Sequence, residues 1–148
     1  MKYDETVLDE VDLPECGVAR FLLLFDGPWA TLIVRELMHG PQRFGELREA
    51  LAGISAHTLT NRLRLFEARG IVTRAAYAEI PPRVVYELTP LGWQLRPVLD
   101  AMNEWGMSAP VSAFAADGAP ARDAVNGWDG CDRPLPRFWH PSGGDLSF

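Results

Sequence analysis

The fold of this chain is decided by residues 54–88, which read ISAHTLTNRLRLFEARGIVTRAAYAEIPPRVVYEL. Within this stretch, Leu59, Leu63 and Phe66 have the i, i+4, i+7 spacing of apolar side chains on one face of an α-helix. Ser55 precedes them as a favourable N-cap residue, and a glycine follows where helices commonly end. The pattern predicts a helix with one buried face and one polar face.

The hydrophobic period changes after this helix. Residues 71–74 (IVTR) and 84–88 (VVYEL) are rich in β-branched and aromatic side chains, which favours strands. Residues 79–83 (EIPPR) cannot lie inside a sheet, because a proline donates no hydrogen bond to a strand ladder. A polar-faced helix followed by a hairpin with an arginine near its tip is typical of a winged helix-turn-helix.

Amphipathic segments on both sides complete this outline. Apolar spacing predicts helices over residues 14–25, 28–39 and 43–51, and a short turn containing glycine joins the last of them to the polar-faced helix. A long helix over residues 89–105 follows the wing, and Pro97 should kink it. The expected fold is mainly α with a small β-hairpin wing, a winged helix-turn-helix.

The polar face of the helix after Ser55 carries groups suited to DNA. Arginine and asparagine have the donor geometry that matches guanine and adenine edges in the major groove. The expected base-contacting residues are His57, Thr58, Asn61 and Arg64. The expected phosphate-contacting or positioning residues are Ser55, Thr60 and Arg62. A structural salt bridge is the alternative for Arg62, and a merely solvated polar face is the alternative for the whole set.

The wing supplies one further candidate, Arg83. A narrow minor groove has a negative potential that attracts arginine, so we expect this side chain to contact DNA there. The alternative is a flexible, exposed arginine.

The charge distribution must be reconciled with a DNA partner. The net charge of −6 and a pI of about 5.0 argue against nucleic-acid binding when taken alone. However, residues 28–106 contain nine arginines and eight acidic residues, and residues 54–74 contain four arginines and one glutamate. The acidic excess lies in the two ends of the chain, which we therefore expect to lie away from DNA.

Several function classes are disfavoured by the sequence. No apolar run reaches membrane-spanning length, and two cysteines make no disulfide framework, so we expect a cytoplasmic, reduced protein without a membrane partner. Cys131 and His140 belong to no ligand spacing, so no metal site is expected. No phosphate-binding glycine loop or nucleophile elbow occurs, and we expect neither an enzyme nor a cofactor.

The chain divides into an acidic arm (1–14), the winged helix-turn-helix domain (15–106) and an extension rich in proline, glycine and aromatic residues (107–148). The first and last helices of the domain are more apolar than so small a core requires, so we expect them to form a homodimer. The expected interface residues are Phe21, Leu22, Leu95, Val98, Leu99, Met102 and Trp105. The alternative is that both helices only cap the monomer core.

Two other functions remain open at this point. One is a small-molecule sensor whose pocket is built from the extension and the dimer helices, lined by Trp105, Trp128, Phe138 and Trp139. This role is compatible with DNA binding, since an effector would favour one dimer geometry over another. The other is a winged helix used only for protein–protein contact.

The sequence of the winged helix-turn-helix domain resembles the HxlR-type regulators, a branch of the MarR-like winged-helix proteins. The resemblance spans residues 15–106 and is carried by Trp29, the segment RELMHGPQRFGEL (35–47), the polar-faced helix and the wing sequence PPRV (81–84). It implies a homodimeric bacterial transcription factor whose fourth helix enters the major groove while the wing touches the minor groove. We therefore expect a sequence-specific repressor bound to a two-fold-symmetric operator.

The resemblance also bears on Cys16. This residue occupies the position of an N-terminal cysteine that senses electrophiles or oxidants in some members of the family. A thiolate there would be favoured by the free N–H groups of the following helix, whereas Asp12 and Glu15 oppose it. The sequence departs from the family at Gly17, where proline is usual, and at Pro28, where a basic residue is common. A packed, inert cysteine is the alternative.

Overall fold

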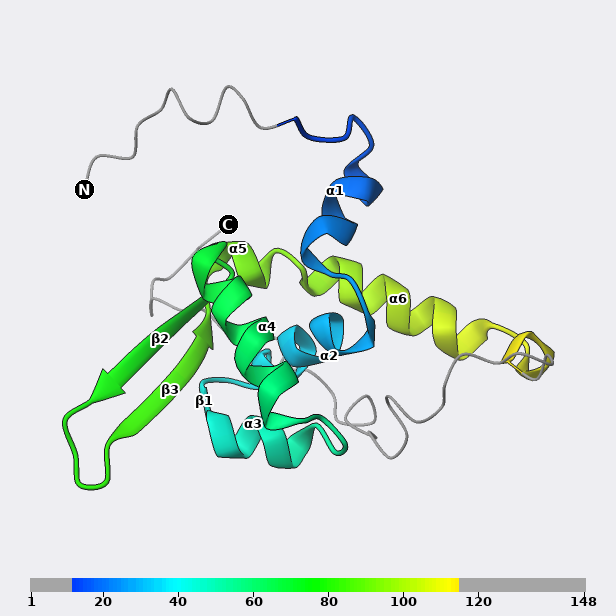
Figure 1. Ribbon diagram of the computed structural model, residues 1–148. Helices are drawn as coiled ribbons and strands as arrows, with labels where there is room; N and C mark the ends of the chain where they lie inside the picture. The colour runs from blue at the N-terminus through cyan, green and yellow to red at the C-terminus, as the bar shows by residue number, and fades with distance from the viewer. Residues whose placement is uncertain (1–11, 115–148) are drawn as a thin grey trace, which may run out of the picture.

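Short helices and one small sheet make up residues 12–114, the part of the chain described by the computed structural model (Figure 1). The elements, in order, are α1 (Gly17–Leu24), α2 (Pro28–Leu37), β1 (Gln42–Arg43), α3 (Phe44–Ala50), α4 (Ala56–Ala68), β2 (Val72–Tyr77), β3 (Arg83–Leu88), α5 (Pro90–Trp93), α6 (Arg96–Ser108) and the 3₁₀ helix η2 (Val111–Phe114). The mainly helical fold with a hairpin wing that the sequence predicts is confirmed.

The sheet is antiparallel, with strand order β1-β3-β2. The β2–β3 hairpin continues from the Val72–Leu88 pair to the Tyr77–Arg83 pair, so β2 extends three residues beyond its predicted end at residue 74. The sequence did not predict β1. Its two residues are too few to show an alternating pattern, and they are strand only because Gln42 lies beside Tyr86 of β3.

The core lies between α2, α3, α4 and the inner end of the sheet. Leu59, Leu63 and Phe66 are all at most 1% exposed, which confirms the predicted inward face of α4. The Ser55 hydroxyl caps α4 by accepting the Thr58 backbone N–H at 3.0 Å. The helix ends as predicted before a glycine in the left-handed region, with φ +72°.

The predicted single helix after the wing is wrong, because two helices occupy this segment. α5 ends at Trp93 and α6 begins at Arg96. Pro97 lies in the first turn of α6, where a helix needs no N–H donor, so it starts a helix instead of kinking one. The Thr89 hydroxyl accepts the Gly92 N–H at 3.1 Å and so caps α5 separately.

Helices α1 and α6 project from the core on the side away from the wing (Figure 1). Leu99, expected at a dimer interface, is buried in the monomer core because α6 packs it toward α2. Phe21 stacks on Phe25 with ring centroids 4.6 Å apart and is half-buried. The other expected interface residues are half-buried (Leu95) or exposed (Leu22, Val98, Met102 and Trp105).

Two observations complete the description. Of the residues expected to line a ligand pocket, Trp128, Phe138 and Trp139 lie outside the described residues, as do Cys131 and His140. Among residues 12–114, no single helix is long and apolar enough to cross a membrane; α1 and α2 pass that test only as a pair bent by 82°.

Candidate DNA-binding surface

A helix-turn-helix is formed by α3 and α4. At the start of α3, the Glu46 carboxylate accepts the Arg43 backbone N–H at 2.7 Å. Gly53 adopts φ +95° in the turn, a conformation that costs glycine little, and Ile54 is buried there. The turn therefore fixes α4 against the core with its polar face outward.

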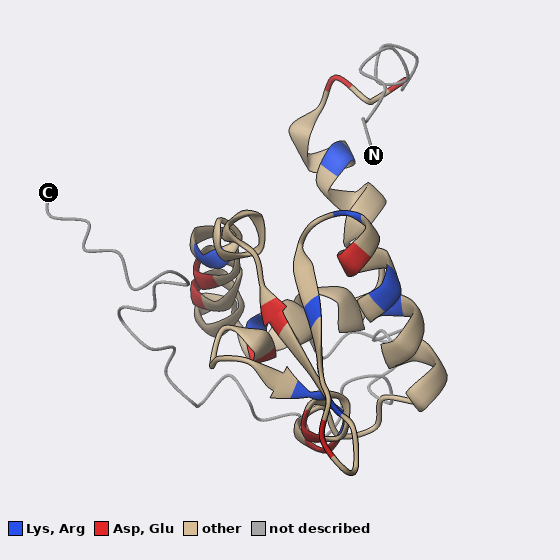
Figure 2. Ribbon diagram, turned by 90° about the vertical axis from the view of Figure 1, so that its left-hand side faces the viewer, with Lys and Arg blue, Asp and Glu red and all other residues tan. Residues whose placement is uncertain are grey.

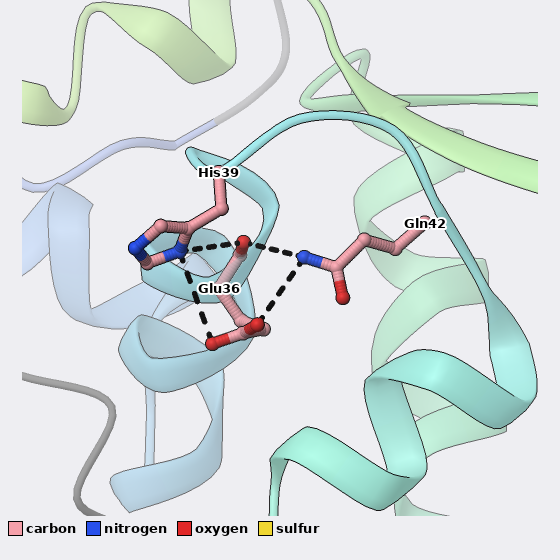
Figure 3. Close-up of polar contacts among 3 residues, drawn as sticks. All are labelled: Glu36, His39 and Gln42. Atoms are coloured by element: carbon pink, nitrogen blue, oxygen red, sulfur yellow. Dashed lines mark hydrogen bonds and ion pairs between the residues drawn. The ribbon is translucent and has the colours of Figure 1, made fainter. Parts of the chain in front are cut away.

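A partly buried polar cluster at the end of α2 precedes this helix pair (Figure 3). The Gln42 amide donates to the Glu36 backbone oxygen at 2.7 Å and to its Oε1 at 3.3 Å. His39 Nδ1 lies 3.9 Å from Glu36 Oε2. Because Gln42 belongs to β1, these contacts join α2 to the sheet immediately before α3 begins.

The exposed face of α4 carries His57, Asn61 and Arg64. Asn61 Nδ2 lies 3.1 Å from His57 Nε2. An amide nitrogen only donates, so this bond requires His57 Nε2 to be unprotonated. The bond holds the two side chains together and leaves the Asn61 carbonyl oxygen and one N–H to meet a base edge.

Three of the expected contact residues have structural roles or less exposure. Ser55 accepts the Thr58 N–H, and its own hydroxyl donates to Thr58 Oγ1 at 2.9 Å. These two side chains therefore build the start of α4. Thr60 is half-buried on the flank of the helix.

Arg62 is paired with a carboxylate of the protein at its surface. Its guanidinium forms an ion pair with Asp26 Oδ1 at 2.5 Å. The hydrogen bond from Arg62, followed by its positive charge, lowers the pKa of the Asp26 carboxyl below its ordinary value. Of the two alternatives that the sequence left open for Arg62, the structure has the salt bridge, which ties α4 to the turn between α1 and α2.

Arg83 is also paired. Its Nη2 lies 3.0 Å from Glu79 Oε1, and its guanidinium lies 4.3 Å from the centroid of the Tyr77 ring. The side chain is therefore held along the wing, in contrast to the loose, exposed arginine considered as the alternative. Arg64, on α4, has no such ion pair within residues 12–114.

Charge is mixed over the described part of the chain. Basic residues occur along α4 and on both strands of the wing, but Glu67 lies on α4 and Glu87 on β3, and both α3 and α6 carry charges of both signs (Figure 2). Cys16 is exposed and free, and it is the N-cap residue of α1. Within residues 12–114, no group of three or more His, Cys, Asp or Glu side chains has an arrangement that could hold a metal ion.

A helix-turn-helix followed by a β-hairpin wing, to which β1 adds a third strand, defines the class of winged helix-turn-helix regulators. The sequence profile of the HxlR-like helix-turn-helix family matches residues 24–112 of this chain. The chain therefore belongs to that family, and it is a transcriptional regulator with a DNA-binding helix-turn-helix domain.

Relatives and solved structures agree with this assignment. An uncharacterized HTH-type transcriptional regulator of Synechocystis, sll1512, is 47% identical over 91 residues, which cover 62% of this chain and 67% of that protein. The reduced form of the redox regulator HypR aligns with a TM-score of 0.60 and 38% identity, covering 63% of this chain and 92% of the HypR chain. The reduced form of the regulator YodB of Bacillus subtilis aligns at 0.55 and 35% identity, covering 63% and 92%.

Three residues important to this surface were not predicted from the sequence. Asp26 is 36 residues from Arg62, a separation that no local pattern covers. Tyr77 and Glu79 contact Arg83. The only feature of the sequence that could have predicted these contacts is the hairpin. Knowing that β2 continued to Tyr77 would have placed its ring opposite Arg83.

Proposed function

We propose that this protein is a sequence-specific repressor that binds a two-fold-symmetric DNA operator as a homodimer. The observation that carries the proposal is the outward polar face of α4, where Asn61 and Arg64 are exposed beside the wing. Both residue types match base edges in the major groove. Membership of the HxlR-like helix-turn-helix family supports the same role.

The exposed apolar residues of the two projecting helices support the homodimer. Each helix exposes a group of large apolar side chains: Val18, Leu22 and Leu23 on α1, and Val98, Met102 and Trp105 on α6. Apolar side chains gathered on one exposed surface mark a contact with a partner. A two-fold dimer would present two α4 helices to half-sites about one helical turn apart, or a multiple of it. Occupying such a site in a promoter would exclude RNA polymerase.

The test is binding of the full chain to the DNA upstream of its own gene, against scrambled DNA of equal length, over a range of salt. Specific binding that weakens steeply with salt is expected. Arg64→Ala should weaken operator binding by about 1–3 kcal/mol and relax the preference at one base pair. Arg69→Ala, which removes the same charge at the exposed C-terminal end of α4, serves as the control.

Two outcomes would change this proposal. Equal losses on operator and scrambled DNA would make Arg64 a phosphate contact instead of a base contact. Weak binding that is the same on both DNAs would contradict sequence-specific recognition. The protein-contact alternative would then gain support, since Arg62 and Arg83 already pair with the chain's own carboxylates.

Control of DNA binding by oxidation is the second candidate function. Cys16 is free and exposed at the start of α1, the helix expected in the dimer interface. HypR, a redox regulator, aligns in both its reduced and its oxidized form. Diamide should release the wild-type protein from its operator and leave Cys16→Ser bound. The same response from both proteins would exclude this cysteine as the sensor.

Control by a small molecule is the remaining alternative. A mostly apolar hollow of about 280 Å³ lies between α2 and α6, lined in part by Leu32, Leu99 and Met102. An apolar compound bound there would contact α6 directly and so act on the expected dimer helix. Release of operator DNA by such a compound, with the effect lost in Met102→Glu, would support this form of control.

A further inference from the structure

The wing holds its arginine in a defined place. The β2–β3 register puts Tyr77 directly opposite Arg83, and the guanidinium lies over the tyrosine ring at 4.3 Å. The turn that follows brings Glu79 back toward β3, with its N–H bonded to the Tyr77 oxygen at 2.9 Å. The Glu79 carboxylate then reaches Arg83 Nη2 at 3.0 Å.

Only part of the Arg83 guanidinium faces solvent. The side chain is 33% exposed, and its Nε is buried without a hydrogen-bond partner among the described groups. The ring covers one face of the plane, and the carboxylate takes a donor at its edge. A phosphate oxygen or a base acceptor in a minor groove would compete with Glu79 for Nη2, the donor that the ion pair engages.

These two neighbours should act in opposite directions on DNA binding. The Tyr77 ring restricts the long arginine side chain before DNA arrives, which reduces the ordering cost of contact. The Glu79 carboxylate is an internal anion that competes with DNA for the guanidinium. Since the pair is at the protein surface, exchange of one anion for the other is possible without unfolding the wing.

We propose that Tyr77 and Glu79 are positioning residues that set how Arg83 engages DNA. Tyr77 aims the guanidinium, and Glu79 is the anion that competes with DNA for it. This inference rests on the proposed function. It explains, in addition, what determines how strongly the wing binds DNA. The partner that Arg83 would contact is double-stranded DNA, through its minor groove and phosphates.

The experiment measures affinity for the upstream duplex and for a scrambled duplex as a function of salt. Glu79→Gln should bind both DNAs more tightly, by roughly threefold to tenfold, and steepen the slope of log K against log salt by up to about 0.9, the value for one phosphate contact. Glu87→Gln removes the same charge from the same hairpin and is the matched control. It should change affinity much less.

The positioning role of the Tyr77 ring is tested by comparing Tyr77→Leu with Tyr77→Phe. Tyr77→Leu should lower affinity several-fold without changing the salt slope, because the arginine charge remains. Tyr77→Phe keeps the ring and should bind as the wild type does. If the two variants behave alike, the ring has no positioning role.

A double-variant comparison shows whether both residues act through Arg83. In an Arg83→Gln background, Glu79→Gln and Tyr77→Leu should have no further effect on affinity. If Glu79→Gln still tightens binding there, or if it equals Glu87→Gln in the wild-type background, Glu79 acts only as a surface charge and the inference is wrong. Failure of the wild type to prefer upstream DNA would instead contradict the proposed function itself.

Discussion

Helices α1 and α2 follow one another in the chain, yet they have opposite environments. α1, GVARFLLL, contains one charged residue and has no buried residue among its eight. α2, PWATLIVREL, contains an arginine and a glutamate, and six of its ten residues are buried, including both of these. α2 contacts α3, β3 and α6, whereas α1 contributes only the partly buried Phe21 and Leu24 to the packing against the core.

The contrast separates apolar composition from burial. A helix is buried by what surrounds it, and α2 lies at the centre of the domain, where even Arg35 and Glu36 are enclosed. α1 leaves Val18, Leu22 and Leu23 more than half exposed. An apolar helix whose outer face is left exposed in the described residues is best explained by an external partner, and this is the physical basis for expecting a dimer.

The largest effect should come from truncating one leucine in each helix. Leu37→Ala in α2 should lower the free energy of unfolding by about 2–5 kcal/mol, because it leaves a cavity in the core. Leu22→Ala in α1 should change it by less than about 0.5 kcal/mol in dilute protein, since the side chain is exposed. Chemical denaturation measures both values.

The same pair of variants tests the dimer. At concentrations where the wild type is dimeric by light scattering, Leu22→Ala should dissociate more readily, and its unfolding midpoint should fall with dilution. Leu37→Ala should keep the wild-type dimer interface. A Leu22→Ala protein that is as dimeric as the wild type would place the interface elsewhere.

Substituting a glycine in α5 and one in α6 should have smaller and opposite effects on stability, because α5 is closely packed at that position and α6 is not. A Cβ at Gly92 would lie 2.5 Å from the Ile71 backbone oxygen, so Gly92→Ala should destabilise the fold by about 1–3 kcal/mol. A Cβ at Gly106 would meet no described atom within 4 Å, so Gly106→Ala should stabilise α6 by about 0.5–1 kcal/mol. Thermal unfolding compares them, and equal changes would contradict this difference in packing.

The smallest effect concerns the turn that joins α1 to α2. Arg62 lowers the pKa of Asp26 there, so the ionised carboxylate favours the folded state. Its contribution is complete above the ordinary aspartate pKa of about 3.9, and it is lost as pH falls through the lowered value. The melting temperature of Asp26→Asn should therefore lie slightly below that of the wild type at pH 7 and approach it toward pH 3. A difference in melting temperature that does not change with pH would mean that the Asp26 charge is not its cause.

Local patterns predicted the elements on which the candidate site is built. The inward face of α4, its Ser55 cap and the hairpin were predicted because they depend on residues close together in the chain. The division between α5 and α6 was missed, because the apolar stripe runs through both helices and Pro97 suits either a kink or a helix start. The three-residue extension of β2 was missed because it depends on pairing with β3.

The candidate site was predicted less completely than the fold. His57, Asn61 and Arg64 face outward, as their angular positions on the helix required. The partners of Arg62 and Arg83 could not be predicted, since one lies 36 residues away and the other two meet across a hairpin turn. Of the residues expected at the dimer interface, only Leu99 is buried in the monomer core. Its helical spacing from the other expected interface residues of the same stripe does not distinguish it from those that stay exposed.

The sequence by itself determined the class of this protein: the period of three to four residues, the caps and the proline turn specify a winged helix-turn-helix, since each depends on neighbouring residues. The tertiary structure decided which charges are available to a partner. Arg64 is left on the surface, whereas Arg62 and Arg83 are held by Asp26 and Glu79. An ion pair forms where the folded chain brings opposite charges within a few ångströms, and no local pattern in the sequence encodes that distance.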